Sequence, residues 1–156
     1  MTLQQTLPSW NQRNLESPEH IYAGITRKWL NNGTVLYYAV STVSRPAIDA
    51  WLDSVVEVLK LWPVDQPYRA IHDATNSSLT PYSRSRIAEV SRNAPIHIRG
   101  RSAAVMSKSL FAHAARMFMT LELARQNKRV ERNLFFDVDG ALAWVLAHQS
   151  RREDVA

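Results

Sequence analysis

The sequence predicts an α/β fold, with one mixed sheet of about five strands and four helices. Segments 21–30 and 34–40 are rich in β-branched and aromatic residues and flank Asn31-Asn32-Gly33, a turn sequence typical of a β-hairpin. Short apolar segments then alternate with segments of helical periodicity. Strands separated by helices need crossover connections, which make neighbouring strands parallel. The hairpin therefore adds an antiparallel part to an otherwise parallel sheet.

The composition is that of one domain with its own core. The chain has 156 residues, of which 46% are hydrophobic, and it contains no cysteine. Disulfides, thiolate metal sites and cysteine nucleophiles are thereby excluded. No apolar run approaches the roughly 20 residues that span a bilayer. The N-terminal residues lack the pattern of a signal peptide, so we expect a cytoplasmic location.

The first 20 residues are polar, and we expect an irregular arm there, followed by the domain over 21–150 and a frayed tail over 151–156. Ser44 is placed to cap a helix that Pro63 ends. Its apolar face recurs at helical spacing in Ile48, Leu52, Val55, Leu59 and Trp62. A second stripe, made of Asp49, Asp53 and Glu57, is either a solvated face or a docking surface for a basic partner.

A strand over 69–73 leads into the polar loop 74–80, after which Thr80 caps a second helix that begins at Pro81. This helix has only a thin apolar seam, formed by Ile87, Val90 and Ala94. We expect it to be largely exposed.

Beyond a strand over 101–106, Ser107 or Ser109 caps a long helix that ends near Asn127. We expect one of its stripes to cover the sheet, namely Leu110, Ala114, Met117, Leu121 and Ala124. Met119 and Leu123 then project elsewhere, which predicts a homodimer unless the N-terminal arm covers them with Trp10 and Leu15. A last strand over 133–136 precedes a helix capped by Asp137 or Asp139.

Sequence patterns of catalysis are missing. The five histidines lack metal-binding spacing, and the four glycines form neither a phosphate loop nor a dinucleotide motif. We therefore expect no enzyme, no metal and no cofactor. His72-Asp73, at a strand end, is either an acid–base pair or a structural pair. Lys108, between two serines, either helps to hold an anion or belongs to an ordinary capped helix.

Two segments resemble a known family. Arg69-Ala-Ile-His-Asp73 and the closing run Glu131-Arg-Asn-Leu-Phe-Phe-Asp-Val-Asp-Gly-Ala-Leu-Ala-Trp-Val-Leu146 are similar to parts of SpoIIAA-like proteins, relatives of the STAS domain (sulfate transporter and anti-sigma factor antagonist). The resemblance covers about residues 21–149 and implies regulation by protein binding. In family antagonists a serine at a helix start is phosphorylated, and Ser83 matches its position. Pro81 and Arg84 stand where the family has Asp and Gly.

The leading hypothesis is a non-enzymatic regulatory or scaffolding domain that binds another protein. The residues expected to form its binding surface are Thr75, Asn76, Ser77, Ser78, Thr80, Ser83, Arg84, Arg86, Ser107, Lys108 and Ser109. A phosphate on Ser83 would lie near Arg84 and Arg86.

Two alternatives remain. The fold that the resemblance implies is similar in outline to lipid-exchange domains, and the long helix offers Phe111, Met117, Phe118 and Met119 to a small apolar ligand. Residues 81–156 hold 13 of the 19 basic side chains, including Arg99, Arg101, Lys128, Arg129 and Arg132. Nucleic-acid binding is disfavoured, however, because no aromatic residues are interleaved with them.

Overall fold

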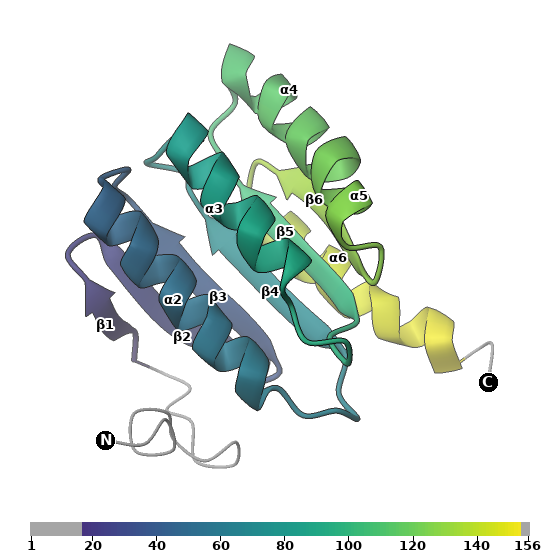
Figure 1. The fold of residues 1–156 in the computed structure, drawn as a ribbon. Coiled ribbons are helices and arrows are strands. Elements are labelled where there is room, and N and C mark those ends of the chain that lie inside the picture. Colours follow the sequence, from purple (N-terminus) through teal and green to yellow (C-terminus); the bar gives the residue numbers. More distant parts are fainter. Residues whose placement is uncertain (1–16, 154–156) are drawn as a thin grey trace.

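The structure, a computed structural model, describes residues 17–153, apart from the side chains of Leu110 and of residues 148–153. A six-stranded sheet runs through it in chain order (Figure 1). The strands are β1 (Glu19–Tyr22), β2 (Ile25–Leu30), β3 (Val35–Val40), β4 (Tyr68–Asp73), β5 (Gly100–Val105) and β6 (Val130–Phe135). β1, β2 and β3 pair antiparallel, and β3 to β6 pair parallel. The predicted α/β fold with one mixed sheet is confirmed, with six strands instead of about five.

The additional strand spans the boundary between the expected irregular arm, which is wrong at Glu19 and His20, and the segment that was expected to form one strand over 21–30. The chain reverses at Ala23 and Gly24, and Gly24 has a φ of +82°, which favours glycine. β1 therefore starts at Glu19 and pairs with β2, where Glu19 forms an ion pair with Arg27. The rest of the expected arm, including Trp10 and Leu15, lies outside the described residues, as do residues 154–156 of the tail.

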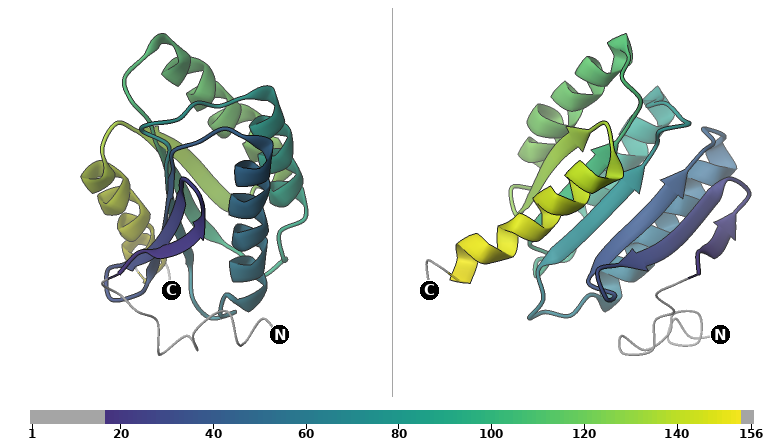
Figure 2. Two further views of the ribbon diagram at one scale, coloured as in Figure 1. Left: turned by 90° about the vertical axis from the view of Figure 1, so that its left-hand side faces the viewer. Right: turned by 180° about the vertical axis from the view of Figure 1, so that it is seen from behind.

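Two helical layers enclose the sheet. On one face lie α2 (Arg45–Leu61), α3 (Pro81–Arg92), α4 (Leu110–Met117) and α5 (Leu123–Gln126), with the π-helical turn η1 (Phe118–Glu122) joining the last two. α6 (Val138–Glu153) lies on the opposite face, as the edge-on view in Figure 2 shows. Right-handed crossovers between strands that advance in one direction place every connecting helix on the same face. Only the last helix, which follows β6, can cover the other face.

Helix starts follow the local chemistry that the sequence predicted. The hydroxyl of Ser44 accepts a hydrogen bond from Ala47 N at 3.4 Å, and Thr80 caps α3 with Pro81 at the first position. Asp137 Oδ1 accepts from Gly140 N at 2.6 Å at the start of α6. Ser109 precedes α4, but its side chain makes no capping hydrogen bond.

The long helix turns its other apolar face to the sheet, so the expected core stripe is wrong. Met117 and Leu121 are 49% and 55% exposed, and Ala114 is exposed as well. The buried side chains are instead Ala112, Ala115, Phe118, Met119 and Leu123. The helix carries two apolar faces, and the one with two alanines allows a closer approach to β6. The wider π turn lets Phe118 and Met119, which are adjacent in sequence, both face inward.

Gly100 is the position where the sheet tolerates no side chain. Its φ is +155°, and a Cβ built on it would lie 1.9 Å from the carbonyl oxygen of Tyr68 on β4. We expect Gly100→Ala to lower the free energy of unfolding by about 3 kcal/mol or more, because backbone atoms of β4 would have to move. Urea denaturation measures the change. Gly140→Ala is the control, since a Cβ there meets side chains instead of backbone, namely the Asp137 carboxylate at 3.1 Å and the Phe135 ring at 3.6 Å. Equal stability of the two variants would contradict this account.

Candidate ligand cavity beneath α3

Two loops at the carboxyl ends of β4 and β5 bring most of the predicted site residues together. Asp73 Oδ1 accepts a hydrogen bond from Thr75 N at 3.0 Å and so fixes the start of loop 74–80. Ser107 Oγ donates to the carbonyl of Thr75 at 2.7 Å and joins the second loop to the first. The exposed members of this polar surface are Thr75, Asn76, Ser78, Ser107, Lys108 and Ser109. Ser77 and Thr80 are half-buried.

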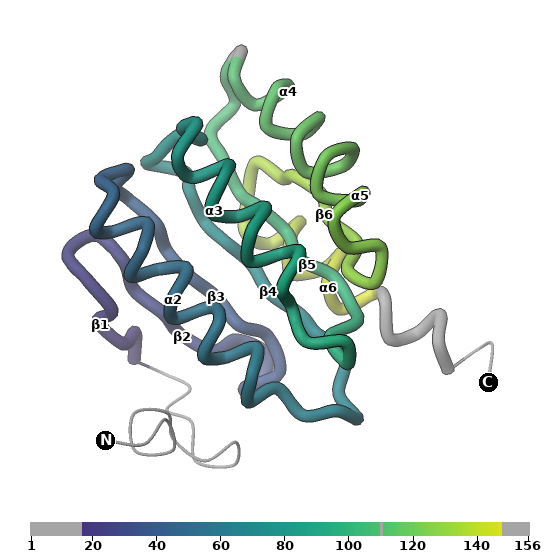
Figure 3. The backbone as a smooth tube through the Cα atoms, viewed as in Figure 1, coloured from purple at the N-terminus to yellow at the C-terminus, as the bar shows by residue number. Residues whose placement is uncertain are grey.

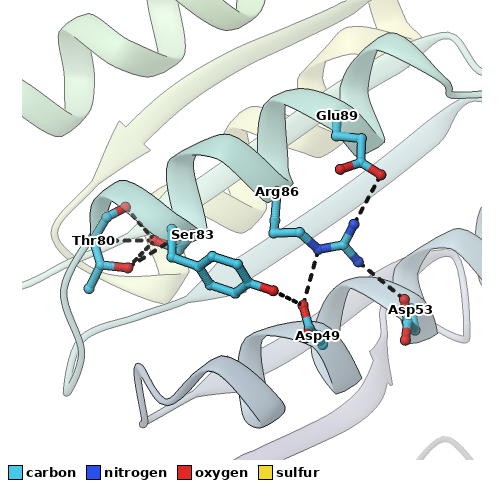
Figure 4. A network of polar contacts seen from close by, with 7 residues as sticks. Asp49, Asp53, Thr80, Ser83, Arg86 and Glu89 are labelled. Carbon is cyan, nitrogen blue, oxygen red and sulfur yellow. Dashed lines mark hydrogen bonds and ion pairs between the residues drawn. The ribbon is translucent and has the colours of Figure 1, made fainter.

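Ser83 lies inside the first turn of α3 and is only 2% exposed. Its Oγ accepts from Thr80 N at 2.9 Å and lies 3.0 Å from the carbonyl of Thr80, while Ser83 N donates to Thr80 Oγ1 at 3.1 Å. These bonds form a reciprocal cap, shown in Figure 4. A kinase would reach this hydroxyl only after the turn opened. Phosphorylation of Ser83 stays a prediction.

Arg86 joins α3 to α2 on the surface of the helical layer. Its guanidinium donates to Asp49 at 3.1 Å, Asp53 at 3.2 Å and Glu89 at 3.1 Å (Figure 4). Burial opposes its charge, but these carboxylates outweigh burial and raise the pKa of Arg86. The acidic stripe on α2 therefore already has a basic partner, within the same chain, at Asp49 and Asp53.

Arg84 leaves α3 on the other side and pairs with Glu122 of η1 at 3.2 Å. Both partners are about half exposed. α3 is thus attached to its two neighbouring helices through side chains at its edges.

Beneath α3 lies a cavity of about 140 Å³. The buried residues of α3 are Ser83, Ala88 and Ser91, all of which have short side chains. The main contacts of α3 are with α2 and α5, between which it lies in Figure 3. Ile87 and Val90 of α3 line the cavity from partly buried positions, and the short side chains between them leave the space under the helix unfilled.

Apolar side chains make most of the cavity wall. α2, η1 and α5 contribute Trp51, Leu52, Val55, Phe118, Met119 and Leu123. Ser102 and Ala104 of β5 also line the space and stay partly exposed in the middle of a covered sheet. At one end the cavity reaches Ser77, Ser78 and Leu79 of loop 74–80. The cavity and the predicted binding surface are therefore adjacent.

His72 is a neutral polar group on this wall. Trp51 Nε1 donates to His72 Nδ1 at 3.2 Å, and the ring stacks on Tyr38 with centroids 5.7 Å apart. Since an indole nitrogen only donates, Nδ1 is the acceptor and the proton of neutral His72 is on Nε2. Burial, and secondarily the positive charge of Arg132, lowers the pKa of His72 to about 4. The residue is uncharged at neutral pH.

Asp73 points away from His72, to the face of the sheet that α6 covers. Its Oδ2 accepts from the hydroxyl of Tyr37 at 2.5 Å. Burial disfavours the carboxylate, but hydrogen bonds from Thr75 and Tyr37 outweigh it and hold the pKa of Asp73 below its usual value. Adjacent strand residues face opposite sides, so the two side chains form no acid–base pair. Asp73 fixes the loop, and His72 belongs to the cavity.

Arg132 brings a positive charge to the cavity wall. Its guanidinium donates to Ser91 Oγ at 2.7 Å and to the carbonyls of Val130 at 3.1 Å and Asn127 at 3.3 Å. Burial lowers the pKa of Arg132 to about 10, with a smaller opposing effect of Tyr68. Arginine still carries its charge at neutral pH with such a value.

The other basic residues that were considered for nucleic acid differ in their exposure. Arg101 is buried, donates to the carbonyl of Trp144 at 2.8 Å and lies over the Trp144 ring. Arg129 donates to the carbonyl of Ala94 at 3.3 Å. The Lys108 ammonium lies 5.6 Å from the centre of the Phe136 ring. Only Arg99 and Lys128 of the predicted nucleic-acid set are exposed.

Among the side chains that the structure describes, no group of acidic or histidine residues is arranged to hold a metal ion. No helix in that range is long and apolar enough to cross a bilayer.

Two residues that line the cavity were assigned to different candidate sites from the sequence. His72 was considered with Asp73, and Arg132 was considered for nucleic acid, yet both line one cavity. The sequence feature that could have indicated the cavity is the thin apolar seam of the second helix. It was interpreted as a sign that the helix is exposed, but a thin seam also leaves space between a helix and the sheet.

Comparison of the chain with family models, curated proteins and solved structures finds no match.

The neutral state of His72 predicts a pH dependence of stability. Its pKa is about 4 in the folded chain, against an ordinary value of 6.5 for a histidine in the unfolded chain, so the unfolded chain takes up the proton first as the pH falls. Stability is therefore lost between about pH 6.5 and pH 4, by about 3 kcal/mol. His72→Asn keeps an acceptor for Trp51 Nε1 and lacks this titration. Urea denaturation at several pH values should show a smaller acid loss for the variant, and parallel curves would contradict a buried neutral histidine.

Proposed function

We propose that this protein binds a small, mostly apolar molecule in the cavity beneath α3. The observation that carries the proposal is the cavity itself, a partly open space of about 140 Å³ between α3 and the sheet. Packed interiors contain few voids of this size. An apolar protein cavity of about 150 Å³ accommodates benzene, which indicates a ligand with about one ring or a short chain.

The walls suit such a ligand. Met106 and Met119 supply flexible thioether side chains that adapt to irregular shapes, and Phe118 and Trp51 supply aromatic surface. Of the four side chains of the long helix that the sequence offered to an apolar ligand, Phe118 and Met119 line the cavity, whereas Phe111 and Met117 are exposed.

α3 covers part of the cavity, which is partly open. The helix is attached by Arg84 to Glu122 and by Arg86 to Asp49 and Asp53, and ion pairs at a surface contribute about 0–1 kcal/mol each. On its inner side, Ile87 and Val90 pack against the core cluster that α2 forms with the sheet, and Ala88 belongs to the cluster of Met106 and Phe118. Movement of α3 would break these apolar contacts as well as the ion pairs at its edges.

Ligand binding of this kind fits a non-enzymatic regulatory role in the cytoplasm, the role that resemblance to SpoIIAA-like proteins implies. Ser77, Ser78 and Leu79 line the cavity and belong to the loop proposed to contact a partner protein. A ligand that displaces this loop changes the surface presented to the partner.

Filling the cavity should abolish binding. We expect toluene, at about ten times its dissociation constant, to stabilise the native protein by about 1.4 kcal/mol, which raises the thermal midpoint by about 3–5 °C. Ala104→Leu places a larger side chain in the cavity and should remove this rise. Ala143→Leu, on an exposed position of α6, is the matched control and should retain it. Differential scanning calorimetry measures the shift. If toluene has no effect on the native protein, the proposed function is wrong.

A second candidate function, self-association, is favoured by the outer face of the long helix. Met117 and Leu121 are 49% and 55% exposed and lie four residues apart, and Phe111, nearer the start of the helix, is 79% exposed. The prediction of a dimer rested on exposed Met119 and Leu123, but both side chains are buried. The exposed face of the long helix is now the proposed interface, since exposed clusters of large apolar side chains mark interfaces. A second copy of the chain is the occupant we propose, because a two-fold axis pairs one apolar stripe with itself.

Charge on this stripe should disrupt the dimer. We expect a sedimentation coefficient of a dimer for the native protein and of a monomer for Met117→Glu/Leu121→Glu. Ile96→Glu also replaces a highly exposed apolar side chain by a carboxylate, far along the sequence from this helix, and should leave the dimer intact. A native protein that stays monomeric at high micromolar concentration would exclude this candidate.

A further inference from the structure

The position of Arg132 is unusual for a charged side chain. Alternate residues of β6 face the helical layer, and Val130 and Leu134 on either side of Arg132 are buried in it. Arg132 extends from the strand to the ends of α3 and α5, where Ser91 and Asn127 accept its hydrogen bonds. It lines the cavity together with His72 and Ser102.

The charge of Arg132 has no anionic partner among the described residues. Every acceptor of its guanidinium is neutral, either a backbone carbonyl or a serine hydroxyl. The ion pairs between described residues are made by other arginines, namely Arg27, Arg84, Arg86 and Arg101. A charge removed from water and left unpaired is costly, and the lowered pKa of Arg132 reflects that cost.

His72 adds a hydrogen-bond donor to the same wall. Its Nδ1 accepts from Trp51, and its Nε2–H has no hydrogen-bond acceptor in the part of the chain that the structure describes. Because the ring stays neutral, the cavity carries one positive charge and not two. One singly charged anionic group would compensate it.

We infer that the ligand of this cavity is an apolar carboxylic acid whose carboxylate pairs with the guanidinium of Arg132. The inference rests on the proposed function, since it names the class of molecule that the cavity binds. The planar fork of a guanidinium matches the two oxygens of a carboxylate, and charge-assisted hydrogen bonds are about twice as strong as neutral ones. The apolar part of the acid lies against Trp51, Phe118 and Met119. The cavity volume limits that part to about one aromatic ring or a short chain.

A tether between β6 and the helices is the alternative role of Arg132. Arg129 supplies the comparison, because its guanidinium donates to the carbonyl of Ala94 beyond the end of α3 and does not line the cavity. Neutralising Arg129 removes a charge and a tether without touching the proposed site. The two arginines therefore separate a tethering effect from a ligand-binding effect.

The test uses benzoate, its neutral isostere benzamide, and toluene as probes in isothermal titration calorimetry. We expect the native protein to bind benzoate about ten-fold more tightly than benzamide, in line with a gain of one charge-assisted pair. Arg132→Gln should weaken benzoate binding about ten-fold and leave toluene binding within about two-fold, because toluene makes no ionic contact. Arg132→Lys should retain part of the benzoate preference, and Arg129→Gln all of it.

The outcomes separate the two proposals. Tight binding of toluene without preference for benzoate would refute the carboxylate inference and leave the proposed function standing. Failure of all three probes to bind would refute both. Equal weakening of benzoate and toluene by Arg132→Gln would show that Arg132 is a tether. If Arg132→Gln does not fold, the preference of the native protein for benzoate over benzamide decides the inference.

Discussion

The short inner side chains of α3 set the geometry of the helical layer. A helix that crosses between neighbouring parallel strands ordinarily buries a broad apolar stripe on the sheet. α3 fully buries only Ser83, Ala88 and Ser91, adds the partly buried Ile87 and Val90, and is supported at its edges by α2 and α5. α2 and η1 must then supply the large side chains that approach from the sides, which they do with Trp51, Phe118 and their neighbours. The cavity forms because the large side chains come from α2 and η1 at the sides and not from α3 above.

Much of the fold followed from local chemistry that depends on few residues. The hairpin turn needs positive φ, and Asn31, Asn32 and Gly33 all have it. Ser44 and Thr80 begin helices because their hydroxyls satisfy backbone N–H groups. The missed strand β1 depended on Gly24, a single glycine whose turn could be recognised only with knowledge of its pairing partner. Local signals predicted the elements well, and the pairing between distant segments less so.

The site could be predicted only in part, because its residues come from separate elements. Thr75 and Ser107 were both expected at the binding surface, and the hydrogen bond between them confirms that they are neighbours. The orientation of the long helix could not be derived from its periodicity. Both faces are apolar, and the choice depends on how closely the helix approaches β6. A stripe of two alanines with Phe118 and Met119 fits that space, whereas Met117 and Leu121 fit it less well and lie outside.

The polar groups of the cavity constrain one another. A charged His72 beside Arg132 would place two cations in an apolar space, and burial with mutual repulsion keeps the histidine neutral. Arginine cannot lose its proton at neutral pH, so its cost of burial is reduced only by hydrogen bonds or by an anion. Ser91 and Asn127 accept such hydrogen bonds, which also hold the ends of α3 and α5. An anionic ligand would supply the compensating charge. A guanidinium has enough donors to bond Ser91 and Asn127 and also to pair with a carboxylate through two parallel hydrogen bonds. A lysine or a glutamine in this position could not do both.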